Sequence, residues 1–183
     1  MKFVNTPLAG LTIVQTQPHT DARGRFVRVY CEEEFFVLRP RLRFMQVNLS
    51  LTRGRGSVRG LHFQRPPAAE AKLIRCLRGA VFDVALDLRA GSATYLQWHA
   101  VELDETAQRQ VFIPEGFAHG FQALSDEAEL LYQHTAPYRP DCEGGVRFDD
   151  ARLDIRWPLT PVNVSPRDRS FAAIDTGFEA IAL

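Results

Sequence analysis

The sequence predicts an all-β protein, in which short antiparallel strands form a sandwich or barrel accompanied by a few short helices. Apolar and polar residues alternate along many short runs, and a period of two is typical of strands with two different faces. Turn signals such as Arg78-Gly79 and Pro114-Glu115-Gly116 separate many of these runs. The period of an amphipathic helix is almost absent. These patterns together favour an antiparallel sandwich or barrel.

The strands can be placed in order along the chain. The clearest run is residues 44–52, in which one face carries Met45, Val47, Leu49 and Leu51 and the other carries Gln46, Asn48, Ser50 and Thr52. Further strands are expected over residues 24–30, 58–64, 71–77, 80–88, 95–103, 110–113, 118–124 and 129–134. One short helix is expected over residues 32–38, and a second in the tail of residues 165–183.

Length and composition favour one domain over residues 1–183. The chain has 183 residues, of which 45% are hydrophobic, enough for one sizeable core and short for two. No run approaches the roughly 20 apolar residues of a membrane span, and the start lacks the apolar core of a signal peptide, so a cytoplasmic location is expected. Acidic and basic residues balance at 22 each, so no net charge favours nucleic acid or a membrane surface.

Cysteines and histidines argue against structural cross-links and metals. The three cysteines, Cys31, Cys76 and Cys142, are odd in number and widely spaced, which is typical of reduced thiols. The stretch Pro114 to His119 is similar to the second half of a metal motif found in cupin barrels. However, none of the five histidines lies two residues from another, and a metal site of that kind needs such a pair with a nearby carboxylate. No bound metal is expected.

The two-faced strands allow two interpretations. In the simpler one, polar residues such as Gln46 and Asn48 face water and the apolar face packs on the core. In the other, the polar face lines a ligand cavity inside a small barrel. The simpler interpretation is favoured for any single position. It weakens where several strands carry groups of unusual chemistry, as His62, Lys72 and Tyr132 do.

Some residues are suited to anion binding and proton transfer. Arg23 and Arg59 each lie next to or near glycine, which lets a ligand approach the backbone, although arginines are common in surface turns. A histidine that transfers protons needs a partner that orients it, and Asp168 is a candidate partner for His62. Tyr132 could donate a proton from the opposite side of a cavity, although a tyrosine at a strand end more often packs.

A series of motifs in order resembles one enzyme family. The chain is similar to the dTDP-4-dehydrorhamnose 3,5-epimerase family from about Asp21 to Asp168, and an ordered series is far more specific than any single motif. The motifs are Asp21-x-Arg23-Gly24-x-Phe26, Gln46-x-Asn48, Arg59-Gly60-Leu61-His62-Phe63-Gln64, Lys72-Leu73-Ile74-Arg75, Gly79 to Arg89, Ile113 to Phe121, Tyr132, Tyr138, Ile155-Arg156-Trp157-Pro158 and Ser165-x-x-Asp168.

The resemblance implies a metal-free jelly-roll barrel of the cupin type, usually a homodimer, which needs no cofactor. Such an enzyme inverts C5, and often C3, of a nucleotide-linked 4-keto-6-deoxyhexose. A ketone at C4 acidifies the hydrogens on both neighbouring carbons, so a base can remove a proton from one face and an acid can return one to the other. By resemblance His62 is the base, Asp168 holds it, Tyr132 is the acid and Lys72 stabilises the enolate oxygen.

The resemblance also implies a binding set for a nucleotide-diphosphate sugar. Arg23 and Arg59 would hold the diphosphate, and Gln46, Asn48, His119 and Tyr138 would line the sugar pocket. The expected substrate-binding set is completed by Phe26, Arg28, Glu143 and Arg169. Residues 1–20 are expected to form a strand segment at the dimer interface, and this segment, which includes Leu11 to Val14, could add a strand to the sheet of the partner.

Arg28 departs from the family pattern. Members that bind thymidine usually have glutamate at this position, two residues after Phe26, so an acceptor for the N–H of the base is replaced by a cation. Thymidine diphosphate is favoured, and another base such as that of CDP or GDP is the alternative. Two other functions stay open: a 3,4-ketoisomerase of a nucleotide sugar, and a cupin that binds a sugar nucleotide without catalysis. The sequence does not fix whether C3, C5 or both are inverted.

Overall fold

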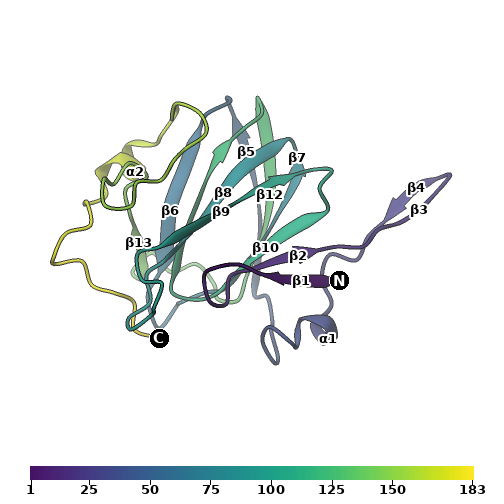
Figure 1. The fold of residues 1–183 in the computed structure, drawn as a ribbon, viewed down its shortest axis with the longest axis horizontal. Helices are drawn as coiled ribbons and strands as arrows, with labels where there is room; N and C mark the ends of the chain where they lie inside the picture. The colour runs from purple at the N-terminus through teal and green to yellow at the C-terminus, as the bar shows by residue number, and fades with distance from the viewer.

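Two antiparallel sheets face each other in the computed structural model, which describes residues 1–183 (Figure 1). The six-stranded sheet has the order β1 (Lys2–Asn5), β2 (Thr12–Gln15), β10 (Arg109–Ile113), β7 (Lys72–Arg78), β12 (Glu127–His134) and β5 (Gln46–Arg53). The five-stranded sheet has the order β13 (Glu143–Gly145), β6 (Val58–Gln64), β11 (Phe117–Ala123), β8 (Ala80–Asp87) and β9 (Trp98–Asp104). The predicted all-β antiparallel fold is confirmed.

A separate two-stranded hairpin and two short helices complete the fold. The hairpin of β3 (His19–Asp21) and β4 (Gly24–Phe26) projects away from the two sheets, at the right of Figure 1. The helices are α1 (Glu32–Phe35) and α2 (Pro166–Ser170). In Figure 1 the helix α2 lies beside β6, on the side of the molecule opposite the hairpin.

Several predicted elements are shorter than expected. The strand predicted over residues 24–30 stops at Phe26, because its partner β3 has only three residues and nothing pairs with the chain beyond. Residues 95–97 form a turn before β9, and the first helix ends at Phe35 instead of residue 38. The tail contains the predicted helix as α2. The sequence patterns missed the short strands β3 and β13, whereas β1 and β2 lie in the amino-terminal segment that was expected to form a strand.

The amino-terminal strand β2 pairs within its own sheet. It lies between β1 and β10, with Ile13 opposite both Val4 and Val111. Leu11 and Val14 are buried. Both edges of β2 are therefore occupied within its own chain, and a strand added to a partner's sheet would have to come from another part of residues 1–20. That residues 1–20 lie at a dimer interface stays a prediction.

The main core fills one part of the space between the sheets and gives way to polar side chains in another. Along the inner face of β7, Cys76 and Ile74 belong to the core and Lys72 follows them. Along β12, Ala128 and Leu130 belong to the core and Tyr132 follows. Since residues two apart share a strand face, each strand changes from apolar to polar along one line. This change places a cavity beyond the core.

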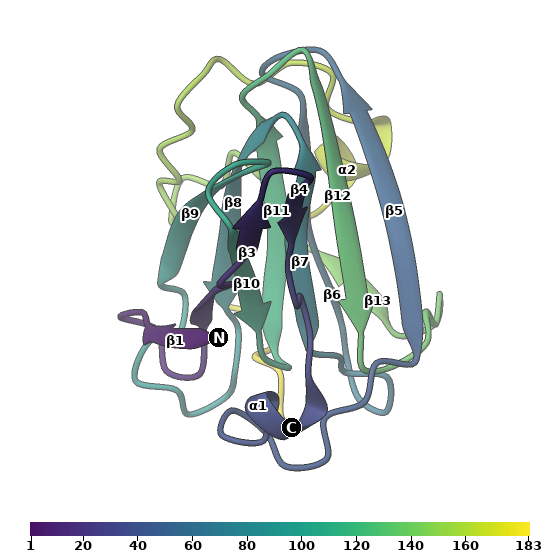
Figure 2. The ribbon, with the colours of Figure 1, turned by 90° about the vertical axis from the view of Figure 1, so that its right-hand side faces the viewer.

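Strand β5 has the reverse orientation of the simpler sequence interpretation. Val47, Leu49 and Leu51 point away from the sandwich and are 58%, 62% and 40% exposed. The polar face, with Gln46 and Ser50, points inward instead. The strand lies at the edge of the six-stranded sheet next to β12, as Figure 2 shows. Its outward apolar face is uncovered in the single chain.

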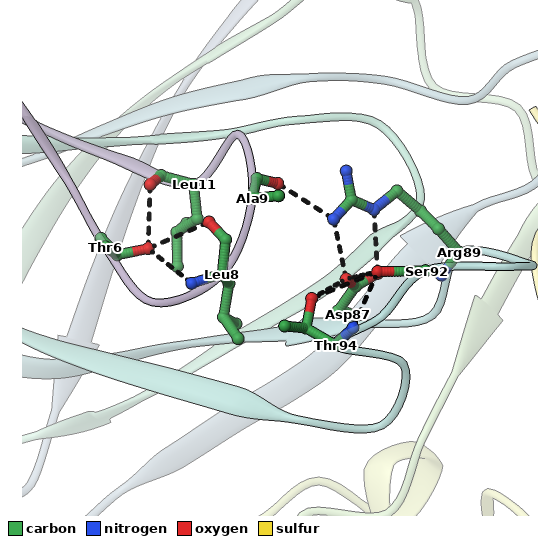
Figure 3. Close-up of polar contacts among 8 residues, drawn as sticks. All are labelled: Thr6, Leu8, Ala9, Leu11, Asp87, Arg89, Ser92 and Thr94. Carbon is green, nitrogen blue, oxygen red and sulfur yellow. Dashed lines mark hydrogen bonds and ion pairs between the residues drawn. The ribbon is translucent and has the colours of Figure 1, made fainter.

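A buried carboxylate connects the amino-terminal turn to the end of β8 (Figure 3). Asp87 is fully buried and accepts hydrogen bonds from Arg89, Ser92 and Thr94, while Arg89 Nη2 also donates to the carbonyl of Ala9. Burial alone would raise the pKa of Asp87, but these donors lower it to about 2. The carboxylate therefore stays charged and clamps two loops together.

No helix in the structure is long and apolar enough to cross a membrane.

Candidate active site

A cavity of about 440 Å³ opens between the two sheets beyond the core. This volume is in the range of small-molecule sites. Its lining is mostly polar and comes from both sheets: Gln46, Asn48, Ser50, Arg59, His62, Phe63, Gln64, Glu70, Lys72, His119, Gly120, Phe121, Tyr132, His134, Tyr138 and Glu143. The inward polar face of β5 thus lines a ligand cavity, as the second sequence interpretation predicts.

His62 and Asp168 form a hydrogen-bonded pair at this cavity. His62 Nε2 lies 2.7 Å from Oδ1 of Asp168, although the two residues are 106 positions apart in sequence. Helix α2 positions the carboxylate, because the Ser165 hydroxyl caps its first turn by accepting the Asp168 N–H at 3.0 Å. The structure thus brings the two predicted partners into contact.

The environment of Asp168 keeps it charged. Its side chain is nearly fully buried, and burial alone would raise its pKa. Hydrogen bonds from His62 and from the backbone N–H of Gly60, at 3.2 Å, outweigh burial and lower the pKa of Asp168. An ionised carboxylate only accepts hydrogen bonds. Nε2 of His62 therefore carries its proton toward Asp168, and Nδ1 is left with the free lone pair.

Glycine at position 60 allows β6 and β11 to approach closely enough to build this pair. Gly60 has φ of +111°, and a Cβ there would lie 2.5 Å from the Cα of Gly120. No other residue fits this backbone and this contact. The strands then continue with His62 directly opposite His119, which brings two histidines to the same part of the cavity.

Tyr132 faces the cavity from the other sheet. Its ring packs edge-on against His119, with centroids 5.9 Å apart, and parallel to His134, with centroids 6.0 Å apart. Burial is the largest cause that raises the pKa of Tyr132 well above its usual range, and the charge of Asp83 adds to it. The hydroxyl is protonated at neutral pH and can act as a proton donor.

Lys72 is buried in a cluster of polar groups at the start of β7. Its ammonium lies 3.2 Å from Oε1 of Glu70 and donates to the carbonyl of His62 at 3.3 Å. Burial would raise the pKa of Glu70, but His134 and Lys72 lower it. Glu70 is thus a charged partner that fixes Lys72 beside the proposed base.

A second histidine–carboxylate pair lies behind the first. His119 Nε2 is 2.8 Å from Oδ2 of Asp83, and both side chains are buried. Sequence reasoning missed Asp83, Glu70, His134, Ser50 and Gln64. An acid within the apolar run Val81 to Leu86 indicates a buried carboxylate, and His134 is two residues from Tyr132 on the same strand face.

The remaining predicted residues divide into two groups. Gln46, Asn48, Arg59, Tyr138 and Glu143 line the cavity with the catalytic candidates. Tyr138 donates from its hydroxyl to Oε2 of Glu143 at 2.7 Å, and its backbone N–H donates to Gln46 at 2.9 Å. Arg167, which sequence reasoning missed, pairs with Glu143 at 2.5 Å.

The second group lies outside the cavity of its own chain. Arg23 and Phe26 are on the projecting hairpin and are exposed, with Arg23 paired only to Asp21. Arg28 pairs with Glu34 of helix α1 on the outer surface, at 3.0 Å. Arg169, in α2, does not line the cavity, and its Nε donates to the carbonyl of Val164. No group of three histidine, cysteine or acidic side chains in the structure could hold a metal ion.

Comparison with known proteins identifies the family. The sequence model described as dTDP-4-dehydrorhamnose 3,5-epimerase matches residues 5–176. The chain belongs to this family. A dTDP-4-dehydrorhamnose 3,5-epimerase of Methanothermobacter thermautotrophicus is 43% identical over 173 residues, which cover 93% of this chain and 92% of the relative. A dTDP-4-dehydrorhamnose 3-epimerase of Streptomyces niveus is 43% identical over 164 residues, which cover 88% of this chain and 78% of the relative.

Solved structures of the family share the fold closely. The 4-keto-6-deoxy sugar epimerase NovW of Streptomyces spheroides superposes with a TM-score of 0.90 at 40% identity, over 94% of this chain and 87% of that one. The dTDP-4-dehydrorhamnose 3,5-epimerase of Bacillus anthracis gives 0.91 at 35% identity, over 94% and 99%. The predicted cupin-type jelly roll is confirmed, and so is the predicted epimerase family, whose members are isomerases.

Proposed function

We propose that the protein epimerises C5, C3 or both in a nucleotide-linked 4-keto-6-deoxyhexose, by removing and returning protons through an enolate. One observation carries the proposal. His62, which is bonded to Asp168 behind it, and Tyr132 come from opposite sheets and line one cavity together with Lys72. A base and an acid on facing walls are what inversion requires, since a proton must leave one face of a carbon and return to the other.

The steps follow from the geometry. Nδ1 of His62 removes the proton from the carbon next to the ketone, and the electron pair of the C–H bond moves to the C4 oxygen as the enolate forms. Asp168 stabilises the imidazolium, and Lys72 stabilises the enolate oxygen by a charge-assisted hydrogen bond. Tyr132 then donates its proton to the opposite face of that carbon, and the ketone re-forms. His62 and Tyr132 exchange protons with water before the next turnover.

Thymidine diphosphate is the favoured nucleotide. Relatives support it, because the Bacillus anthracis enzyme is described with TDP and pyrophosphate bound and the Legionella pneumophila enzyme with dTDP-4-keto-L-rhamnose. Arg28 is the reason to test other bases, since it carries a cation at a position expected to contact the base. The relatives also include both 3,5-epimerases and 3-epimerases, so C3 and C5 need separate measurement. The cytoplasmic location stays a prediction.

Deuterium exchange tests the function. Incubation of the enzyme with dTDP-, CDP- and GDP-4-keto-6-deoxyglucose in deuterated water is expected to place deuterium on C3, C5 or both, seen by NMR. His62→Ala should abolish exchange. A 3-keto product would show a ketoisomerase instead. Binding without exchange by any of the three substrates would favour the non-catalytic cupin and contradict the proposal.

The active unit is proposed to be a homodimer in which the hairpin of one protomer completes the site of its partner. Three observations support this arrangement. The outward face of β5 leaves Val47, Leu49 and Leu51 exposed, as interface residues are before association. Phe26 is 74% exposed on the hairpin. Arg23, expected at the diphosphate, lies on the same hairpin, outside the cavity of its own chain.

Mixing two inactive variants tests the shared site. Arg23→Ala and His62→Ala homodimers each lack one component in both sites. If Arg23 acts in the partner's site, subunit exchange creates mixed dimers with one intact site, and activity returns to about a quarter of wild type. If Arg23 acts within its own chain, mixing restores nothing. Light scattering on the wild type measures the oligomeric state independently.

A further inference from the structure

Glu70 is a buried carboxylate that connects three residues of the cavity. Gln64 Nε2 donates to its Oε2 at 2.6 Å, the Lys72 ammonium lies 3.2 Å from Oε1, and His134 Nδ1 lies 3.5 Å from Oε2. Its side chain is only 8% exposed. Such a carboxylate costs free energy to bury unless its partners compensate. The proton-transfer steps at His62 and Tyr132 do not use Glu70 or His134, so this cluster needs a role of its own.

His134 holds a central place in the cavity wall. It is opposite Lys72 on one neighbouring strand and opposite Gln46 on the other. Its ring stacks parallel to Tyr132, with an interplanar angle of 10°. Nδ1 is buried toward Glu70, and Nε2 lies 3.4 Å from Nδ2 of Asn48 at the cavity. One nitrogen is thus turned to a carboxylate and the other to the ligand space.

We propose that Glu70 and His134 form a subsite that accepts a hydrogen bond from a sugar hydroxyl and holds the ring in register with Lys72. The inference rests on the proposed epimerase function. Nδ1 of His134 lies 3.5 Å from Oε2 of Glu70, so the carboxylate favours a proton on Nδ1, which leaves Nε2 as an acceptor. In the structure Nδ2 of Asn48 lies 3.4 Å from this nitrogen, and a sugar hydroxyl would take the place of that amide donor. A hydroxyl can donate to Nε2, whereas a diphosphate only accepts, so this subsite binds the sugar and not the phosphates.

The groups around His134 support this arrangement of its two ring nitrogens. The titratable groups that face it are Glu70 from the loop before β7, Lys72 from β7 and Tyr132 from its own strand. Glu70 is paired with the Lys72 ammonium, so its charge is already balanced. Because the same carboxylate fixes both Lys72 and His134, a hydroxyl bound at Nε2 is placed at a set distance from the group that meets the enolate oxygen.

Two substitutions and two substrate analogues test the subsite. His134→Phe keeps the ring that stacks on Tyr132 and removes both nitrogens, and His134→Gln offers an amide acceptor in its place. The 4-keto-6-deoxy sugar nucleotide is compared with analogues that lack the C2 or the C3 hydroxyl, with exchange at C5 as the readout. His99→Phe, on β9 outside the cavity, is the matched control.

The expected result is a change in binding more than in turnover. His134→Phe should raise KM for the full substrate about fivefold to tenfold, the range of one hydrogen bond, with kcat changed less than about threefold. For one of the two analogues the variant and the wild type should have the same KM, because the lost hydroxyl and the lost nitrogen are one interaction. His134→Gln should recover part of the affinity.

A loss confined to one analogue, together with recovery in His134→Gln, is a readout that packing alone would not give. An unchanged KM in His134→Phe, or equal losses for all three substrates, would overturn the subsite. Absence of any exchange by the wild type would instead count against the epimerase function itself.

Discussion

Replacing Asp168 by asparagine should prevent His62 from acting as a base without changing the shape of the cavity. Asp168 accepts the Nε2 proton of His62 at 2.7 Å and itself does not line the cavity. Asparagine has nearly the same shape, but its amide nitrogen can donate to Nε2. The imidazole proton then moves to Nδ1, the atom that must be free to attack a C–H bond. In the variant, His62 would keep its position but carry its proton on Nδ1, so it could not act as a base.

Two contributions set the size of the effect. A positioned general base contributes about 10²- to 10⁴-fold in rate. As His62 becomes a cation, a carboxylate about 4 Å away from the charge stabilises it by about 4 kcal/mol at an effective dielectric constant of about 20, which corresponds to nearly 10³-fold. Both routes predict that kcat of Asp168→Asn falls by about 10²- to 10⁴-fold while KM changes less than about threefold.

The assay is initial-rate deuterium incorporation over a range of substrate concentrations. Thermal unfolding checks that the variant is folded, since the Gly60 N–H can still donate to the side-chain oxygen of asparagine. Asp141→Asn is the control, because Asp141 forms an exposed ion pair with Arg139, and it should behave as wild type. A loss of kcat below about fivefold in Asp168→Asn would refute the assignment of His62 as a base oriented by Asp168.

Three further predictions concern the acid, the strand contact and the buried clamp. Tyr132→Phe keeps the stacked ring and removes the donor, so kcat should fall at least about 10²-fold with little change in KM, measured by the same exchange assay. Gly60→Ala forces a Cβ to within 2.5 Å of Gly120 Cα, and urea unfolding should show a loss of about 2 kcal/mol or more. Asp87, whose pKa is lowered to about 2, contributes stability that is present above pH 4 and lost as pH falls toward 2. In Asp87→Asn this acid-dependent loss of about 2 kcal/mol should be missing from unfolding free energies measured against pH.

The strands were predictable from the sequence because their period is local, but the direction of a face was not. In β5 the alternation of Val47, Leu49 and Leu51 with polar residues is unambiguous. The simpler interpretation nevertheless placed the apolar face toward the core, whereas the structure places it outward. Period two fixes which residues share a face and says nothing about what covers it. Because β5 lines a polar cavity with its inner face, its apolar side chains are left on the outer face, which reverses the usual orientation of a half-buried sheet.

The site was predictable only where motifs carried it. Asp168 was paired with His62 by resemblance, and the structure confirms the contact across 106 positions. Glu70 and His134 were missed because neither belongs to a quoted motif, and only the register of β7 against β12 brings them together. Arg28 was expected to contact the nucleotide base, yet it pairs with Glu34 on the outer surface of its own chain. Its position depends on the direction of the preceding β3–β4 hairpin, which the motif does not specify.

Three imidazoles, each with a carboxylate on one nitrogen, surround a single cavity, and exposure separates their tasks. The side chain of His62 is 32% exposed, that of His134 is 12% and that of His119 is 5%. A carbon acid must come within bonding distance of its base, so the most open ring, backed by the nearly closed Asp168, is suited to proton removal. The more enclosed pair of His119 with Asp83 packs against Tyr132 and is suited to orienting it. In the proposed mechanism this arrangement leaves His62 free to meet the substrate as the base, while His119 holds the proposed acid Tyr132 in place.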